Sequence, residues 1–258
     1  MDHIYQHFRN EERQFIDQVL EWKDTVLNQY SPKLTDFLDP REQEIVASVV
    51  GENLDVKVMF SGGVQDTERK RAFIYPDYYQ PLEEDFQLAL FEIHYASKFI
   101  SLQHRQVLGS LMSLGLKRSK FGDIRFYEEV VQFVCASEIA DYLRANFHEI
   151  GRAKVTLKEM NVEKLIPHVE DVQEIVTTVS SLRLDVVCSA IYTISRQKIQ
   201  PLITNGLVKV NWKTVDSVSF ECREGDTLSV RGFGRSKLVS MEGKTKKDRF
   251  RVIIHKQK

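Results

Sequence analysis

The chain has 258 residues, of which 42% are hydrophobic and 28% charged, as is usual for a folded globular protein. This length is sufficient for two or three small domains, and no apolar run reaches the roughly 18 residues that span a bilayer. Three cysteines without CxxC spacing argue against a disulfide framework and a zinc site. The polar N-terminus lacks the pattern of a signal peptide. We therefore expect a cytoplasmic protein without a metal or cofactor.

The net charge of −1 conceals an uneven distribution along the chain. Residues 181–258 contain 16 Lys and Arg against 7 Asp and Glu, a charge of +9, whereas residues 1–180 contain 20 against 30, a charge of −10. An acidic body with a basic C-terminal module is typical of proteins that contact nucleic acid through that module. The alternative is a chance clustering of solvated charges.

Residues 1–82 are expected to form an α+β subdomain that begins with helices. Residues 11–29 carry apolar side chains at near-helical spacing and predict an amphipathic helix. After a break at residues 31–40, Asp39 is suited to cap a second helix that runs to about Gly51.

Two strands at residues 54–60 and 69–76 are then predicted to form a hairpin closed by SGGVQDTE. The segment SGGVQDT is similar to the SGG-x-D-S loop with which ATP pyrophosphatases bind pyrophosphate at a helix N-terminus. Here Gln65 intrudes before the aspartate and a second strand follows instead of a helix. We therefore interpret the two glycines as turn residues.

Residues 83–175 are expected to form an RRM-like α+β subdomain of the split βαβ type. The apolar run at 86–100 fits a strand or a helix. The further predicted elements are a helix at 104–116, a strand at 130–136, a capped helix at 137–151 and a strand at 152–160. This segment lacks the aromatic RNP pattern of an RNA-stacking sheet, so we interpret it as a scaffold.

Residues 181–258 are expected to form a module of two short helices on a small twisted sheet. One helix starts near Arg183, and the next is N-capped by Ser195 and ends at Asn205-Gly206. Strands are predicted at 207–212, 217–221 and 227–232.

Cations occupy the starts of both predicted helices, where Arg183, Arg196 and Lys198 oppose the helix dipole. Such positions are explained if a phosphate binds there to unpaired amides and a guanidinium group. Solvated surface charge is the alternative for any single residue. Further candidates for RNA contact lie on the following strands and on a glycine-flanked loop: Lys209, Lys213, Arg231, Phe233, Arg235 and Lys237.

A second basic patch lies within the acidic body, in the sequence LKRSKFGD. Lys117, Arg118 and Lys120 follow a predicted helix end, where the helix dipole alone also accounts for cations. We retain them as secondary RNA-binding candidates.

The C-terminal motifs resemble the αL RNA-binding domain named after small-subunit ribosomal protein four. These motifs are RLD at 183–185, SR at 195–196, I-x-x-G-x-V-x-VN at 203–211 and GD at 225–226. The whole chain, including HRQVLGSLMSLGLKRSKFGDI, resembles the bacterial YlmH family. This resemblance implies a cytoplasmic RNA-binding protein, and we expect it to be a monomer that binds ribosomal RNA and tRNA. It also implies a role on large ribosomal subunits with stranded peptidyl-tRNA, in ribosome-associated quality control.

Two residues depart from the αL pattern. Pro201 lies inside the second helix and is expected to kink it. Trp212 follows Asn211 where the family commonly has glycine, so the turn is built differently or the indole is exposed. Core packing is the favoured reading of Trp212, and stacking on a base is the alternative.

Two other functions are compatible with this domain arrangement. An RNA-modifying enzyme would need a catalytic aspartate loop or a glycine-rich cofactor loop, and neither GxGxxG nor a Ser/His/Asp or Cys/His set stands out. A cell-division adaptor would use the acidic body as a docking face. We expect an RNA-binding protein that is not an enzyme.

Overall fold

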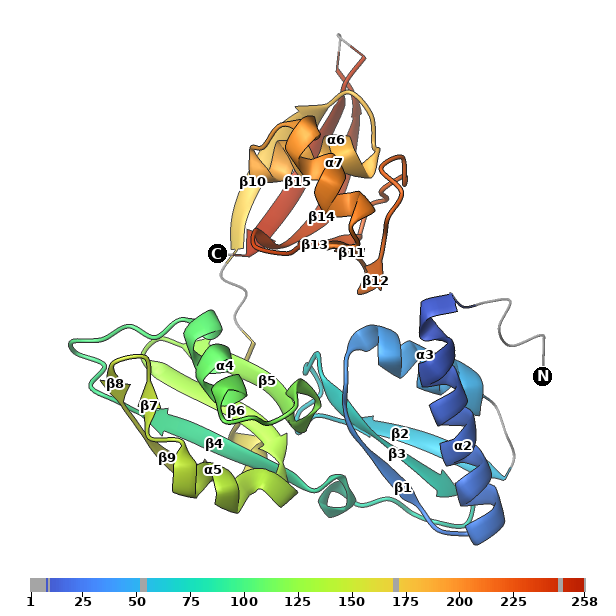
Figure 1. Cartoon of the computed structure of the whole chain (residues 1–258), viewed down its shortest axis with the longest axis vertical. Helices are drawn as coiled ribbons and strands as arrows, with labels where there is room; N and C mark the ends of the chain where they lie inside the picture. The colour runs from blue at the N-terminus through green and yellow to red at the C-terminus, as the bar shows by residue number, and fades with distance from the viewer. Residues whose placement is uncertain (1–7, 9, 52–54, 169–171, 246–247, 258) are drawn as a thin grey trace. The chain divides into compact units, whose positions relative to one another are not determined.

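The computed structural model describes residues 8, 10–51, 55–168, 172–245 and 248–257. The chain forms two compact units, residues 1–169 and 170–258, each of which is described by itself (Figure 1). Within the described ranges, no helix is long and apolar enough to cross a membrane.

The first unit begins with two helices packed on a three-stranded antiparallel sheet of order β1-β3-β2. The elements are η1 (Asn10–Glu12), α2 (Arg13–Gln29), β1 (Lys33–Leu38), α3 (Pro40–Val50), β2 (Val56–Ser61) and β3 (Lys70–Pro76). Both predicted helices and the β2–β3 hairpin are confirmed. Asp39 accepts a hydrogen bond from the Glu42 amide while the Glu42 carboxylate accepts one from the Asp39 amide, so α3 starts in a capping box.

Strand β1 was not predicted, because its sequence lies between turn residues and reads as a break between the two helices. It pairs with β3, which follows more than thirty residues later. The buried Thr35 hydroxyl accepts a hydrogen bond from the Ala72 amide at 2.9 Å, and the Thr35 carbonyl accepts one from Arg71 Nε at 2.7 Å. The strand is therefore specified by contacts across the sheet and only weakly by its own pattern.

The rest of the first unit is the split βαβ fold that we predicted. Its elements are η2 (Glu83–Phe86), β4 (Leu88–His94), α4 (His104–Ser113), η3 (Arg118–Lys120), β5 (Phe121–Tyr127), β6 (Val130–Ala136), η4 (Ser137–Ile139), α5 (Ala140–Asn146), β7 (Glu149–Ile150), β8 (Ala153–Lys154), β9 (Thr156–Met160) and η5 (Val162–Lys164). The main sheet is antiparallel with the order β5-β6-β4-β9, which places β4 and β6 at its centre. Helices α4 and α5 share one hydrophobic core with this sheet.

Two expectations for this region were wrong in detail. The strand β5 was missed, and it supplies the fourth strand that the fold requires. The helix expected to reach Gly151 ends at Asn146, and Gly151 instead occupies the turn between β7 and β8 with φ of 61°.

The centre of the opposite face of this sheet is also buried. Leu90 and Val134 pack there with Phe37 of β1, and the Phe37 ring approaches so closely that a Cβ on Gly122 would lie 2.7 Å from it. The side chain of Gln132, on the same face, accepts a hydrogen bond from the Ile166 amide at 2.9 Å. The centre of the face on which RRM domains stack bases is therefore covered by other parts of this unit.

The second unit is a six-stranded antiparallel sheet with two helices on one face (Figure 1). Its elements are β10 (Val172–Val179), α6 (Leu184–Tyr192), α7 (Arg196–Thr204), β11 (Val208–Val210), β12 (Lys213–Thr214), β13 (Thr227–Val230), β14 (Gly234–Lys244) and β15 (Phe250–Gln257). The strand order is β10-β15-β14-β13-β11-β12. Both helices and the strands β11 and β13 match the prediction, and Pro201 lies within α7, which continues to Thr204.

Several expectations for this unit need correction. Residues 217–221 do not form a strand, and Glu221 makes only an isolated bridge with Arg183. The long strands β14 and β15 were not predicted. Residues 172–175, which we expected in the middle subdomain, begin β10, which pairs with β15 along its whole length. The C-terminal sheet therefore starts before the basic segment does.

Candidate nucleic-acid interface

The starts of α6 and α7 meet at a buried carboxylate, Asp185. Its side chain is fully buried and accepts hydrogen bonds from Arg183 Nε at 3.1 Å, Arg196 Nη2 at 2.5 Å and Gln200 Nε2 at 3.0 Å. Both guanidinium groups are about half exposed, at 41% and 51%. Asp185 therefore fixes two arginines from different helices side by side at the surface.

The same contacts explain the ionisation of Asp185. Burial by itself raises the pKa of a carboxyl group, but the hydrogen bonds from Arg183, Arg196 and Gln200 outweigh it and lower the pKa of Asp185 to about 2. The pKa of Arg183 is raised by the hydrogen bond and the charge of the same carboxylate. The cluster thus carries a net charge of +1 at neutral pH.

The amides at the two helix starts differ. At α6 the amides of Leu184 and Asp185 donate to the carbonyls of Phe220 and Val218, so this end offers no unpaired amides, contrary to our expectation. At α7 the amides of Arg196 and Gln197 have no acceptor within the described part of the chain. Ser195 occupies the N-cap position as predicted, although its side chain makes no cap hydrogen bond. A phosphate would therefore meet amides only at α7.

The remaining predicted cations divide between two faces of the unit. Lys198 is exposed in the first turn of α7, two residues after Arg196. On β11, Val208 and Val210 point into the core shared with the helices, so the exposed Lys209 between them points to the outer face. Arg235 lies in the same row as Lys209, because both residues pair with Ser229. Lys237 shares this outer face, since it alternates with the buried Ser236 and Leu238 on β14.

The predicted glycine-flanked loop is shorter than expected. Residues 231–233 form the β13–β14 turn, whereas Arg235 and Lys237 belong to β14. Arg231 is exposed in this turn, and Phe233 is 39% exposed with its ring centroid 5.8 Å from that of Tyr192. Lys213 begins the edge strand β12.

The secondary basic patch is largely engaged within the first unit. Lys120 Nζ lies 2.6 Å from an Asp36 oxygen and 3.0 Å from a Glu138 oxygen. Arg118 donates to the carbonyls of Phe121 and Gly122, and burial lowers its pKa to about 10. Lys117 is exposed. We therefore retain only Lys117 as a candidate for RNA contact.

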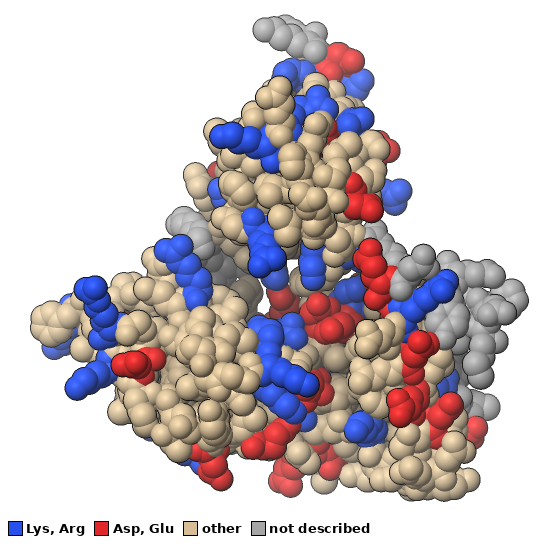
Figure 2. Space-filling view, in the orientation of Figure 1, with Lys and Arg blue, Asp and Glu red and all other residues tan. Residues whose placement is uncertain are grey.

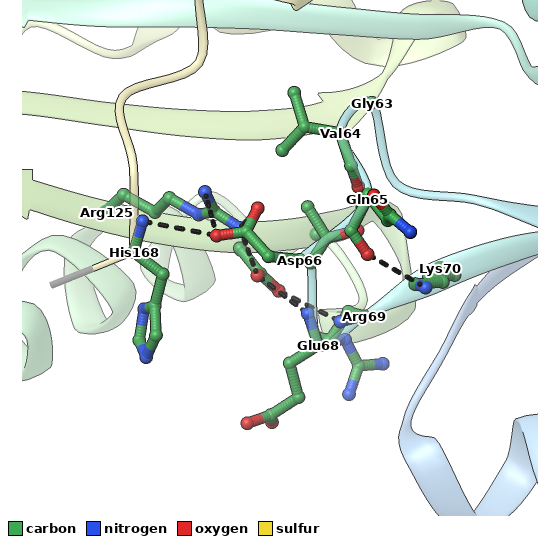
Figure 3. A network of polar contacts seen from close by, with 12 residues as sticks. Gly63, Val64, Gln65, Asp66, Glu68, Arg69, Lys70, Arg125 and His168 are labelled. Carbon is green, nitrogen blue, oxygen red and sulfur yellow. Dashed lines mark hydrogen bonds and ion pairs between the residues drawn. The ribbon is translucent and has the colours of Figure 1, made fainter. Parts of the chain in front are cut away.

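The SGGVQDT segment is a hairpin turn anchored to the middle sheet (Figure 3). Asp66 makes an ion pair at 3.0 Å with the buried Arg125 of β5 and also accepts a hydrogen bond from the His168 amide. Asp123 accepts hydrogen bonds from the amides of Glu68 and Arg69, each at 2.9 Å. Strand β3 follows the loop directly, so the interpretation of the two glycines as turn residues is confirmed. The polar groups of the loop contact β5 and the His168 amide, and these contacts help to hold the first unit together.

The three cysteines are buried and unpaired. Burial raises the pKa of Cys188 to about 12 and also raises the pKa values of Cys135 and Cys222. These groups are therefore thiols at neutral pH and poor nucleophiles. No group of three His, Cys, Asp or Glu side chains suited to a metal ion occurs among the described residues.

The two units also differ in net charge. Residues 170–258 contain 16 Lys and Arg against 10 Asp and Glu, whereas residues 1–169 contain 20 against 27. Figure 2 shows many Lys and Arg side chains on the visible face of the C-terminal unit and many Asp and Glu side chains around α2 and α3. Polyanion attraction is therefore concentrated in the C-terminal unit.

The sequence pattern did not reveal two parts of this interface. The role of Asp185 was missed, although an acid two residues after Arg183 in RLD was a signal for a local ion pair. The contact between Arg235 and Trp212, whose ring centroid lies 5.4 Å from the guanidinium carbon, joins residues that are far apart in sequence.

Comparison with known proteins identifies three family models along the chain. They are "YlmH, N-terminal" at residues 11–79, "Putative RNA-binding domain in YlmH" at 81–164 and "S4 domain" at 182–228. The chain is 53% identical to "Ribosome-associated protein quality control protein P2" of Bacillus subtilis (strain 168), over the full length of both. It is also similar to the solved structure "Cell division protein ylmH from Streptococcus pneumoniae", with 35% identity and a TM-score of 0.54. That match covers 63% of this chain and 99% of the other.

Proposed function

The chain belongs to the YlmH family of RNA-binding proteins, and we propose that it binds structured ribosomal RNA and tRNA without catalysing a reaction. We place this activity in the cytoplasm on large ribosomal subunits that carry stranded peptidyl-tRNA, in ribosome-associated quality control. The name of the Bacillus subtilis relative, which is 53% identical over its whole length, supports this role. We further propose that the protein acts as a monomer.

The observation that carries the proposal is the arginine pair at Asp185. A cation at a helix start is unfavourable for the helix itself, and here the buried carboxylate holds two of them at fixed positions. Asp185 engages Nε and Nη2 of each guanidinium group, and these hydrogen bonds leave the Nη1 groups able to donate to a phosphate. Together with the unpaired α7 amides and Lys198, they form a site suited to a phosphate backbone.

The second cation group lies on the opposite face of the sheet. Lys209, Arg235 and Lys237 point away from the helices, so they and the arginine pair face different directions. A protein that contacts one RNA segment through its helices and another through its sheet fits a site where ribosomal RNA and tRNA meet.

The proposal that the protein does not catalyse a reaction is supported by the structural roles of the residues that were candidates for catalysis. The phosphate-loop candidate is a hairpin turn that contacts the middle sheet, and the cysteine thiols are buried. The centre of the RRM-type sheet face is covered by Phe37 and by residues near Ile166. RNA contact is therefore assigned mainly to the C-terminal unit.

The test must remove the cations without leaving Asp185 as an unpaired buried charge, which would destabilise the unit. We choose the quadruple variant Arg183→Gln, Asp185→Asn, Arg196→Gln and Lys198→Ala, which lowers the net charge by two. The matched control replaces the exposed Lys33 and Lys57 of the first unit by Ala, with the same charge change.

RNA affinity and co-sedimentation with large subunits are measured for both variants across a salt series. The quadruple variant should bind more weakly to all RNA sequences, because phosphate contacts do not read bases. Its log–log salt slope should shrink by about 0.7 to 0.9 per lost phosphate contact. Equal losses in both variants would show that bulk charge explains binding and would refute the site.

A further inference from the structure

The turn between β11 and β12 contains a tryptophan in a backbone conformation that favours glycine. Val210 pairs directly with Lys213, so Asn211 and Trp212 form a two-residue hairpin turn. Their φ angles are 49° and 63°, both in the left-handed region. Two-residue turns of this kind prefer Asn-Gly, and a bulky side chain at the second position is strained. The tight turn is thus retained despite the tryptophan.

Hydrogen bonds of Asn211 fix this turn. Its amide donates to the Thr227 carbonyl, its side-chain oxygen accepts from the Thr227 amide at 2.9 Å, and its Nδ2 donates to Asp226 Oδ1 at 2.8 Å. Asp226 in turn accepts from the Arg223 amide at 2.7 Å. The surrounding structure therefore holds Trp212 at a defined position in spite of the backbone strain.

Trp212 does not serve as core packing. It is half-buried, and it is absent from the hydrophobic residues that form or line the C-terminal core in the described part of the unit. The favoured sequence-based reading of this residue is therefore not supported. Its contact is polar: the Arg235 guanidinium carbon lies 5.4 Å from the indole centroid, a cation–π arrangement.

The setting of this pair is basic. Arg235 and Lys209 flank the small Ser229 across the sheet, and the exposed Lys237 pairs with Thr227 on the same face. Small side chains on the middle strand leave room for Arg235 to reach the indole. An aromatic ring beside several cations is the arrangement with which proteins bind single-stranded nucleic acid, because the cations attract the backbone while the ring stacks on a base.

We propose that Trp212, supported by Arg235, is a stacking platform for one unpaired nucleobase on the outer face of the C-terminal sheet. The proposal rests on RNA binding by this unit and adds what the RNA must offer: a base outside a duplex, such as one in a loop or bulge. Bases inside a helix are already stacked on their neighbours and cannot present a face to the indole.

The test uses the full chain with the substitution Trp22→Phe. Because the chain has two tryptophans, this substitution leaves Trp212 as the single tryptophan. The probes are a ten-nucleotide single-stranded RNA, a blunt RNA duplex of equal length and inorganic polyphosphate. Single-stranded RNA should quench the Trp212 fluorescence, whereas polyphosphate should bind without quenching it. The duplex should bind with little quenching.

The variant Trp212→Gly separates stacking from folding, since glycine suits the left-handed turn. Its melting temperature should be unchanged or higher. Its affinity for single-stranded RNA should fall roughly 5- to 150-fold, the range for base–aromatic stacking, while its affinity for polyphosphate stays the same. The control Lys237→Ala should weaken binding of both probes and leave the quenching at saturation unchanged.

The outcomes distinguish this proposal from the general function. If single-stranded RNA binds without quenching, or if Trp212→Gly weakens polyphosphate binding equally, the platform is refuted while RNA binding stands. If no RNA probe binds the full chain, RNA binding by this unit and the platform are both refuted.

Discussion

Replacing Asp185 by Asn should destabilise the C-terminal unit, because this carboxylate joins the two helix starts. Its pKa falls from an ordinary value of 3.8 to about 2, in spite of burial, through the hydrogen bonds of Arg183, Arg196 and Gln200. Each pKa unit corresponds to 1.36 kcal/mol, so ionised Asp185 contributes about 2 kcal/mol to the free energy of unfolding. The folded-state pKa lies below the unfolded one. The contribution is therefore complete above about pH 4 and is lost as the pH falls towards 2.

Urea denaturation of the full chain measures this effect. With Trp22→Phe in the background, the fluorescence of Trp212 reports on the C-terminal unit alone. At pH 7 Asp185→Asn should lower the free energy of unfolding by about 2 kcal/mol. The control Asp216→Asn, at an exposed position, should change it by less than about 0.5 kcal/mol. The gap between the two variants should narrow below pH 4. The proposed role of Asp185 would be refuted if both variants lost the same free energy of unfolding. It would also be refuted if the difference between them did not depend on pH.

Two further predictions concern the architecture. Gly63→Ala should destabilise the first unit by about 1 to 3 kcal/mol in thermal or urea unfolding, because Gly63 has φ of 105° and its new Cβ would lie 2.4 Å from Val162 Cγ1. Gly151→Ala, at φ of 61° but with open space around it, is the control and should cost only about 1 kcal/mol. Residues 170–258 alone should fold and retain most of the RNA affinity, whereas residues 1–169 should bind weakly in a gel-shift assay. Equal affinity of the two fragments would contradict the charge argument.

Elements with local signals could be predicted from the sequence. The α3 start follows from Asp39 and Pro40, whose capping chemistry is complete within four residues. Helix α7 follows from the spacing of Ile199 and Ile203, both fully buried. The signals for these helices lie within the segments themselves, so contacts with distant parts of the chain have little effect on where the helices form.

Strands that depend on distant partners could not be predicted. The basic segment that forms β15 looks like a solvated tail, yet Val252 and Ile254 are fully buried between β10 and β14. The same limit applies to the site. Arg183 and Arg196 were found from their places at helix starts, but only the folded structure brings both to Asp185. Lys120 appeared to be a surface cation, and its partner Asp36 lies 84 residues away.

The arrangement of cations bears on how one small unit can hold RNA. The RRM-type sheet of the first unit has α4 and α5 on one face and Phe37 on the centre of the other, so the centre of neither face is open for bases. The C-terminal sheet differs, because its helices cover one face and its outer face carries Lys209, Arg235 and Lys237. Phosphates can approach the helix starts while an unpaired base reaches the opposite side. Cations that face apart cannot neutralise the same stretch of backbone. On the proposed function, we therefore expect the two groups to contact separate RNA segments and to contribute independently to affinity.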